Sequence, residues 1–229
     1  MTTLFITGID TNIGKTIACG ALANTLLKKQ FRTFTQKWVE TGVSNIGAKI
    51  SADLAEHQCI ANSNFNTAKN SEHAPYLFQL PASPHLAAKM EKTEIDCAYL
   101  IRQTQKLEEK CQHLLIEGAG GLCVPLNSST LTIDLAATLN LPIVLVTSGK
   151  LGSINHTILS LDYCTQRNLD LRAVVYNAYP NSSDVITKDT RMLLKHRVAH
   201  LHPKTIWLDM EIGATDLALD DIQTARLLR

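Results

Sequence analysis

The stretch LFITGIDTNIGKTIACGALANTLLKKQ, residues 4–30, sets the architecture of this chain. It begins with a short apolar run typical of a buried strand and ends with an amphipathic pattern typical of a helix. Between them lies GIDTNIGKT, which approaches the phosphate-binding loop G-x-x-x-x-G-K-[ST]. That motif requires glycine at position 9, where this chain has Ile9, and Gly8 lies one residue too early. Either the match is accidental or the loop is a variant that is one residue longer.

The strand and the helix on either side favour the longer loop. In a phosphate loop the first backbone N–H groups of the helix point at phosphate oxygens, and the helix dipole attracts the anion. Lys15 would reach the outer phosphates, and the hydroxyl of Thr16 would bind Mg²⁺. The alternative is an ordinary strand-to-helix turn capped by Thr11 or Asn12, with Lys15 in solvent. We expect a phosphate-binding loop.

Composition and charge are those of an ordinary globular protein. The chain has 229 residues, of which 45% are hydrophobic and 19% charged, and its formal net charge is +1 at pH 7. This length suits an α/β sheet covered by helices, so we expect a single domain over residues 1–229. The sequence has no basic run and no patch of basic and aromatic residues, so we expect neither nucleic acid nor a membrane as a partner.

The cysteines and the N-terminus indicate a cytoplasmic protein. Six cysteines form no C-x-x-C pair and no regular framework, which suits reduced thiols: Cys19, Cys59, Cys97, Cys111, Cys123 and Cys164. The N-terminus lacks the basic region and apolar stretch of a signal peptide. No run approaches the ~18 apolar residues that cross a bilayer. We therefore expect a cytoplasmic location.

Short apolar runs alternate with longer amphipathic segments along the chain. The runs predict strands at 4–8, 32–39, 113–120, 142–149, 172–179 and 205–208. The segments between them predict helices at 14–30, 52–62, 94–111, 131–140, 153–168 and 185–197. This alternation predicts an α/β fold with a doubly wound, mainly parallel sheet flanked by helices, of the P-loop nucleoside triphosphate hydrolase type. The segment 62–84 shows no regular pattern and is expected to form loops.

Three charged residues lie where ligands bind in open α/β sheets, at the ends of predicted elements. Glu117 directly follows a buried strand in HLLIEGAGG, and Asp53 starts a predicted helix. Together with a phosphate loop they are candidate Mg²⁺ ligands, because Mg²⁺ is usually held by one or two carboxylates and phosphate oxygens. The alternative role for both is helix capping or a turn. Lys37, at the end of RTFTQK, is a candidate phosphate ligand, with solvation at the surface as its alternative.

Five stretches together resemble the dethiobiotin synthetase family. They are TGIDTNIGKT (7–16), KWVETG (37–42), PASPH (81–85), EGAGGLCVPL (117–126) and KLGSINH (150–156), in family order over about two-thirds of the chain. Members of this family carry the phosphate loop with one extra residue, G-x₅-G-K-T, which accommodates Ile9. The resemblance implies a reaction in which 7,8-diaminononanoate, CO₂ and ATP, with Mg²⁺, give dethiobiotin, ADP and phosphate. It further implies a carbamate and a carbamic-phosphoric anhydride as intermediates.

The resemblance also implies roles for particular residues. Thr16, Asp53 and Glu117 match the magnesium ligands, while Lys37 matches the catalytic lysine, assisted by Lys15. The ATP site would comprise Asn12, Ile13, Gly14, Lys15, Thr16, Ile17, Asp53, Glu117, Gly118, Ala119 and Gly120, with Asn177 at the adenine. Substrate would be bound by Thr11, Lys37 and Thr41, and across a homodimer interface by Gly152, Ser153 and Asn155 at a helix start.

The chain departs from the family pattern at three places. Asn12 stands where many members have glutamate, and Trp38 follows Lys37 where proline is usual. KTIWLDMEI, residues 204–212, only loosely follows the G-x-I-P stretch beside the adenine. The sequence therefore leaves the nucleotide preference open.

Three histidines near the C-terminus suggest a metal site at first sight. His196, His200 and His202 lie in HRVAHLH, and the first two could share a helix face. No acidic or cysteine partner accompanies them in that stretch, so we expect an exposed helix end.

A second hypothesis is a dimeric switch-type ATPase of the chromosome-partitioning kind, which has a similar fold. Such proteins carry another lysine inside the loop, as in K-G-G-x-G-K-T, whereas residues 9–13 contain none. Their membrane-targeting relatives end in a basic amphipathic helix. Here DLALDDIQTARLLR, residues 216–229, is acidic before its arginines. Both features favour the dethiobiotin synthetase hypothesis.

Overall fold

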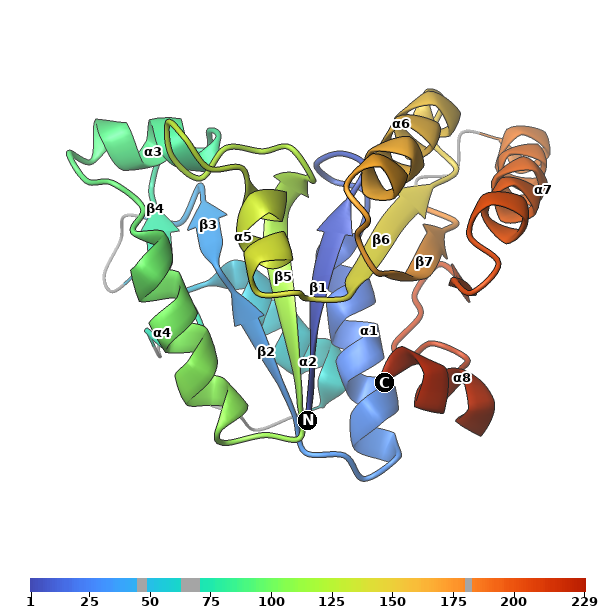
Figure 1. Ribbon diagram of the computed structural model, residues 1–229, viewed down its shortest axis with the longest axis horizontal. Helices are drawn as coiled ribbons and strands as arrows, with labels where there is room; N and C mark the ends of the chain where they lie inside the picture. The colour runs from blue at the N-terminus through green and yellow to red at the C-terminus, as the bar shows by residue number, and fades with distance from the viewer. Residues whose placement is uncertain (45–48, 63–70, 180–182) are drawn as a thin grey trace.

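In the computed structural model, which describes residues 1–44, 49–62, 71–179 and 183–229, six parallel strands form the main sheet (Figure 1). Their bounds are β1 Thr2–Gly8, β2 Thr33–Lys37, β5 His113–Gly121, β6 Ile143–Ser148, β7 Leu171–Asn177 and β8 Ile206–Met210. They lie in the order β2-β5-β1-β6-β7-β8. Each overlaps a predicted strand, and the predicted parallel sheet is confirmed.

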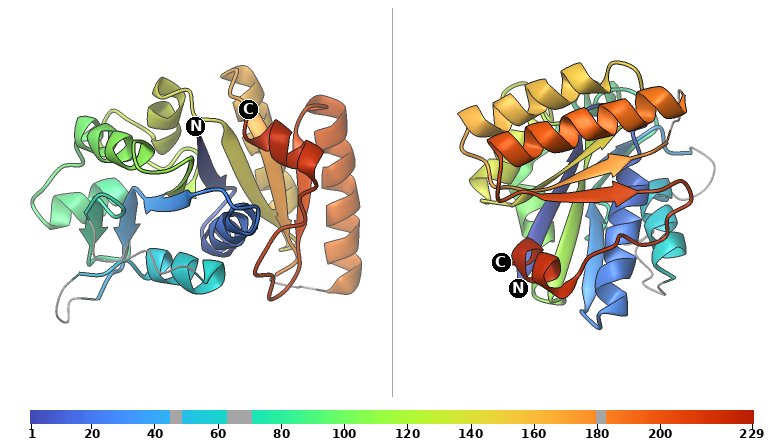
Figure 2. Two further views of the ribbon diagram at one scale, coloured as in Figure 1. Left: turned by 90° about the horizontal axis from the view of Figure 1, so that it is seen from below. Right: turned by 90° about the vertical axis from the view of Figure 1, so that its right-hand side faces the viewer.

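Helices cover both faces of this sheet (Figure 2). The predicted helices are present as α1 Lys15–Lys28, α2 Ala52–Ala61, α4 Cys97–Glu108, α5 Thr132–Thr138, α6 Ser153–Gln166 and α7 Asp184–Leu201. Along β1, Phe5 packs in the core beneath α4, α5 and α6, whereas Leu4 and Ile6 pack with α1. All three side chains are fully buried, which explains why the strand is apolar on both faces. Every helix within residues 1–44, 49–62, 71–179 and 183–229 is too short or too polar to span a lipid bilayer.

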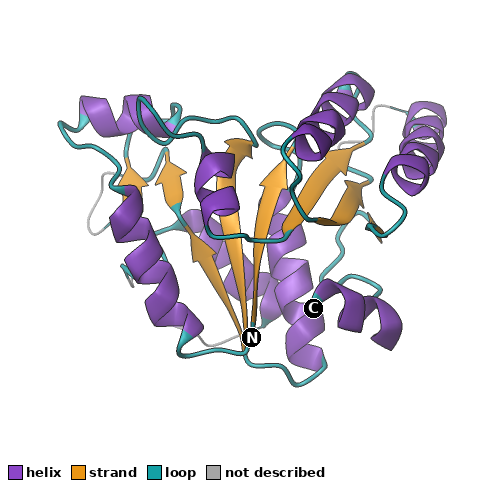
Figure 3. Cartoon of the chain, viewed as in Figure 1, coloured by secondary structure: helices purple, strands orange, loops and turns teal. Residues whose placement is uncertain are grey.

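The carboxyl ends of the strands meet at one edge of the sheet, and the loop after β1 lies there (Figure 3). β1 pairs with β5 on one side and β6 on the other. On the first side, β2 follows β1 in the chain and lies at the outer edge, beyond β5. On the second side, β6, β7 and β8 follow one another outward. The strand order therefore reverses beside β1, which is where open α/β sheets form their ligand crevice.

Four short elements differ from the sequence-based expectation. They are β3 Val39–Thr41, β4 Tyr76–Phe78, α3 Pro84–Met90 and α8 Asp221–Leu227. The predicted strand 32–39 is wrong at its end, because it divides at Trp38 and β3 pairs with β4 in a separate sheet. The expected loop 62–84 contains β4, while its residues 63–70 lie outside the described residues. These elements are too short to show a hydrophobic period.

The division at Trp38 has a physical cause. The Trp38 ring packs 5.0 Å from that of Phe5, centroid to centroid, in the core. Its indole Nε1 donates to Thr104 Oγ1 at 3.1 Å, and that hydroxyl donates to Gln36 Oε1 at 2.8 Å. The backbone N–H of Trp38 lies 3.4 Å from the carbonyl oxygen of Glu117. A proline here would have no N–H to donate, so tryptophan adds a contact to β5.

Replacing Thr104 by valine should lower the free energy of unfolding by about 1–3 kcal/mol. The substitution removes the Thr104 hydroxyl, which is the shared partner of the Trp38 indole N–H and the side-chain oxygen of Gln36. Both groups then remain buried without that hydrogen bond. Urea denaturation followed by tryptophan fluorescence measures the difference. Thr93→Val is the control, because Thr93 is exposed and should change stability little. An equal effect of both substitutions would contradict this explanation.

Candidate active site

The loop after β1 is a glycine loop with one extra residue. The N–H of Ile9 donates to Val146 O of β6 at 3.1 Å, so Ile9 extends the strand pairing and the turn begins after it. Gly14, directly before α1, has a φ of 92°, and a Cβ there would lie 2.3 Å from Asn177 Nδ2. Glycine is favoured at position 14 by conformation and by space. Asn12 has a φ of 55°, which asparagine tolerates well.

Lys15 lies at the start of α1 and folds back over the loop. Its Nζ donates to Asp10 O at 2.7 Å. Burial, with the nearby charge of Lys37, lowers the pKa of Lys15 to about 8. A phosphate bound beside it would favour the charged form, because opposite charges stabilise one another. The loop and Lys15 together suit an anionic ligand.

A cluster of four side chains, which we name the Lys37 cluster, lies next to the loop: Thr16, Lys37, Asp53 and Glu117. Nζ of Lys37 lies 2.6 Å from Asp53 Oδ2 and 2.8 Å from Glu117 Oε1. The hydroxyl oxygen of Thr16 lies 3.2 Å from Asp53 Oδ1 and 3.1 Å from Glu117 Oε1. Thus α1, β2, α2 and β5 each supply one member.

The charges of the Lys37 cluster stabilise one another. Burial lowers the pKa of Lys37, but Glu117 and Asp53 more than offset burial and raise that pKa above its ordinary value. Burial raises the pKa of Glu117, yet Lys37 and His57 hold it well below the usual range. Both groups therefore remain charged at neutral pH. Pairing is essential here, since an unpaired buried charge is strongly unfavourable.

His57 and Cys19 adjoin this cluster, and the sequence analysis did not identify His57. Its Nε2 lies 2.8 Å from Glu117 Oε2, and both side chains are only 1% exposed. One ligand atom each of Cys19, His57 and Glu117 lie within 4.8 Å of one another. Burial lowers the pKa of His57, but Cys19 and Glu117 raise it to about 10. The signal for His57 was its spacing of four residues from Asp53, which places both on one helix face.

Glu40 of β3, also missed, anchors the start of α2. Its Oε1 accepts hydrogen bonds from the N–H groups of Ala52 at 2.8 Å and Asp53 at 3.4 Å. Its other oxygen accepts from the hydroxyl of Ser51, the N-cap residue of α2. Burial raises the pKa of Glu40. These bonds fix the backbone of Asp53, from which its side chain extends to Lys37.

A cleft of about 850 Å³ opens at this edge of the sheet, a volume typical of small-molecule sites. Of the predicted site residues it is lined by Thr11, Asn12, Gly14, Lys15, Thr16, Ile17, Lys37, Thr41, Asp53, Glu117, Ala119, Gly120 and Asn177. Two others, Ile13 and Gly118, lie behind the lining. The Ile13 side chain is buried in the core, and a Cβ on Gly118 would meet Phe5 at 2.7 Å.

Asn177 and the segment after β8 form the far side of the cleft. Asn177 Nδ2 donates to Ile13 O at 2.9 Å, and its Oδ1 accepts from Tyr179 N at 3.0 Å. Beside it lie Met210 and residues 211–215. The loosely matching stretch 204–212 therefore does reach the cleft, with Asn177 as its neighbour.

Gly152, Ser153 and Asn155 lie apart from this cleft, at the start of α6. Gly152 is the N-cap with a φ of 95°. The Ser153 hydroxyl lies 3.0 Å from Ser148 Oγ, whereas Asn155 is exposed. The cleft lining, in the described residues, includes none of the three. Their predicted role, binding substrate across a homodimer interface, stays a prediction.

The oxygens of the Lys37 cluster suit a hard divalent cation. A hydroxyl and two carboxylates are ligands that Mg²⁺ accepts. The Thr16 oxygen lies 3.2 Å from that of Asp53 and 3.1 Å from that of Glu117. Neighbouring ligands in an octahedron with bonds of about 2.1 Å are about 3 Å apart. The donor set therefore fits Mg²⁺.

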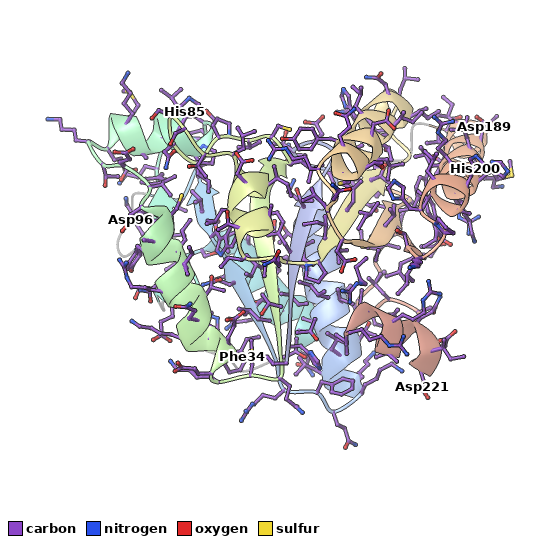
Figure 4. All side chains as sticks on the ribbon, in the orientation of Figure 1. Phe34, His85, Asp96, Asp189, His200 and Asp221 are labelled. Atoms are coloured by element: carbon purple, nitrogen blue, oxygen red, sulfur yellow. The ribbon has the colours of Figure 1, made fainter. Side chains whose placement is uncertain are left out.

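The C-terminal histidines form no comparable group. His196 and His200 are exposed on α7, and Figure 4 labels His200 there. Nε2 of His202 lies 3.3 Å from Thr165 Oγ1. Within the described part of the chain, the three histidines belong to no metal-ligating cluster.

Comparison with solved structures supports the fold. The MinD cell division protein of Aquifex aeolicus superposes with a TM-score of 0.54 at 10% sequence identity, over 94% of this chain and 86% of that one. At this identity the likeness shows a shared architecture and nothing more specific. The predicted P-loop type of fold is confirmed.

Sequence comparison is more specific. The family AAA_26, described as an AAA domain, matches residues 2–202. The ATP-dependent dethiobiotin synthetase BioD 2 of Haemophilus ducreyi is 42% identical over 91% of this chain and 97% of its own length. The ATP-dependent dethiobiotin synthetase BioD of Chlorobaculum tepidum is 42% identical over 83% of this chain and 79% of its own length. This chain, with its extended glycine loop, belongs to the dethiobiotin synthetase family.

Proposed function

We propose that this protein is an ATP-dependent dethiobiotin synthetase that closes a ureido ring on 7,8-diaminononanoate with CO₂. The observation that carries the proposal is Nζ of Lys37, held 2.6 Å from Asp53 and 2.8 Å from Glu117 beside the glycine loop. This arrangement brings a charged lysine and two carboxylates to the glycine loop. Family membership supplies the substrate class.

ATP would lie along the cleft. Its phosphates would be bound by the loop and helix-start amides of residues 12–17, where the helix dipole favours anions, and by residues 117–120. Lys15 reaches the same loop. Asn177 would contact the adenine at the far side of the cleft.

Mg²⁺ would be held by Thr16, Asp53 and Glu117, whose oxygen donors suit it. When bound, the ion would neutralise charge on the phosphates. The residues themselves hold the two carboxylates in place. Lys37 takes part in that task, because its ammonium pairs with both carboxylates.

The reaction begins when one amine of the substrate adds to CO₂ and loses a proton, giving a carbamate. A carbamate oxygen then attacks the γ-phosphorus of ATP, and the bond to ADP breaks. The second amine attacks the carbonyl carbon of the resulting anhydride and loses a proton, phosphate leaves and the ring closes. Lys15 and Lys37 stabilise the negative charge that develops on the transferring phosphoryl group. Holding the three reactants together removes much of the entropic barrier.

The diamine would bind between Thr11, Lys37 and Thr41 on one side and a second subunit on the other. Thr11 and Thr41 line the cleft. Gly152, Ser153 and Asn155 would bind the substrate carboxylate of the neighbouring subunit, since Gly152 opens a helix N-terminus. The protein would then be a homodimer, and we place it in the cytoplasm.

The competing hypothesis, a switch-type ATPase, shares the fold but differs in chemistry. MinD resembles this chain in architecture at 10% identity, whereas the dethiobiotin synthetases reach 42%. The loop also lacks the additional lysine of switch ATPases. We therefore favour the synthetase.

Pure protein given 7,8-diaminononanoate, bicarbonate and Mg-ATP should form dethiobiotin and ADP in equal amounts. Mass spectrometry detects the first product, and a coupled assay measures the second. Omitting the diamine should suppress ADP release, because the phosphoryl acceptor is then missing. ADP release that ignores the diamine would favour the switch ATPase instead.

Lys37→Ala should reduce turnover at least about 10²-fold, because the reaction loses a preorganised cation at the transferring phosphoryl. Steady-state dethiobiotin formation measures the loss, and circular dichroism establishes that the variant is folded. Lys49→Ala is the matched control: Lys49 is an exposed lysine paired with Glu91. Near-normal activity of a folded Lys37→Ala protein would remove Lys37 from the mechanism.

A further inference from the structure

We propose that His57 is a positioning residue that fixes the Glu117 carboxylate, so that one chosen oxygen faces the metal site. This inference rests on the magnesium site of the proposed function. It adds a residue outside the ligand set that controls how well the ligands bind.

The two oxygens of Glu117 have separate partners. Oε2 lies 2.8 Å from His57 Nε2. Oε1 lies 2.8 Å from Lys37 Nζ and 3.1 Å from Thr16 Oγ1, on the side of the cleft. The terminal torsion of a glutamate is soft, so a carboxylate without such a partner turns readily. The imidazole therefore selects Oε1 for the cleft.

The position of His57 in α2 links the two carboxylates. Asp53 and His57 are one helical turn apart and lie on the same face of α2. Asp53 reaches Lys37 with Oδ2 at 2.6 Å, while His57 reaches Glu117 at 2.8 Å. One helix thus supplies one carboxylate and holds the other. The spacing between Asp53 and Glu117 is set by α2 as well as by Lys37.

The hydrogen bond of the imidazole ring is made to Glu117. Among the described residues, Nδ1 of His57 has no hydrogen-bond partner, although the ring is almost completely buried. Cys19 of α1 packs nearby, with its sulfur within 4.8 Å of the other ligand atoms. The bond to Glu117 is therefore the contact that His57 is placed to make. In metalloproteins, partners of this kind typically change metal affinity about 10–100-fold when removed.

The test measures Mn²⁺ binding by electron paramagnetic resonance in the purified chain with ADP, without any turnover. Three variants differ in what they present to Glu117. His57→Gln keeps an amide donor near the position of Nε2, whereas His57→Asn places its amide about one methylene short. His57→Leu fills the space without a donor. Cys19→Ala is the control for packing around the ring.

We expect His57→Asn and His57→Leu to weaken Mn²⁺ binding about 10–100-fold, His57→Gln to restore most of it, and Cys19→Ala, which keeps the imidazole and its bond to Glu117, to weaken it much less than His57→Leu does. Thermal unfolding of each variant accompanies the titration. If His57→Leu does not fold, the Asn and Gln pair decides the outcome. Equal Mn²⁺ affinity in folded Asn, Gln and wild-type proteins overturns the inference, even when their melting temperatures differ.

The same experiment separates this inference from the proposed function. Suppose that the wild-type protein and the variants bind Mn²⁺ as expected, but the wild-type protein forms no dethiobiotin. The proposed substrate is then wrong, and the role of His57 stands. Wild-type protein that binds no Mn²⁺ overturns both the metal site and the positioning role.

Discussion

The ammonium of Lys37 between the carboxylates of Asp53 and Glu117 is the interaction on which the site depends. Both carboxylates point into the space beside the glycine loop, and without a cation they would repel one another in a largely buried position. A buried ion pair of this kind contributes little net stability, because desolvation opposes the attraction. Its value is therefore positional: it holds charge of both signs where phosphates and a cation would bind.

Sheet register brings these groups together. In the pairing of β2 with β5, Lys37 lies directly opposite Glu117, at the carboxyl edge of both strands. β5 also pairs with β1, whose end leads into the glycine loop. A shift of one residue in either register would point these side chains at the opposite face. The apolar strands that fix the register therefore also fix the site, although they contact no ligand.

Support around the cluster comes from residues with no chemical role of their own. Glu40 holds the first N–H groups of α2 and His57 holds Glu117, so that α2 is attached to β3 at one end and to β5 along its face. Trp38 closes the turn between β2 and β3 by packing on Phe5. A site made from four elements needs such attachments, because geometry looser by about 1 Å loses much of its effect.

Local signals were enough to locate the phosphate loop, the main strands and the candidates Lys37, Asp53 and Glu117. Each depends on hydrophobic period, or on the position of a polar residue at a strand or helix end, and both are properties of short segments. The family resemblance then supplied a substrate that no local pattern contains. The short elements β3, β4, α3 and α8 escaped detection, because they contain too few residues to show a period.

Long-range packing alone determined which of those residues meet. The spacing of His57 from Asp53 places both on one face of a helix, but no local pattern shows that Glu40 faces Ala52 or that His57 faces Glu117. Their partners are 12 and 60 residues away in sequence, so the contacts exist only once β3, α2 and β5 have packed. The amino-acid sequence therefore specified which functional groups are available. Tertiary packing specified their distances and charges, because both depend on burial and on neighbours from other elements.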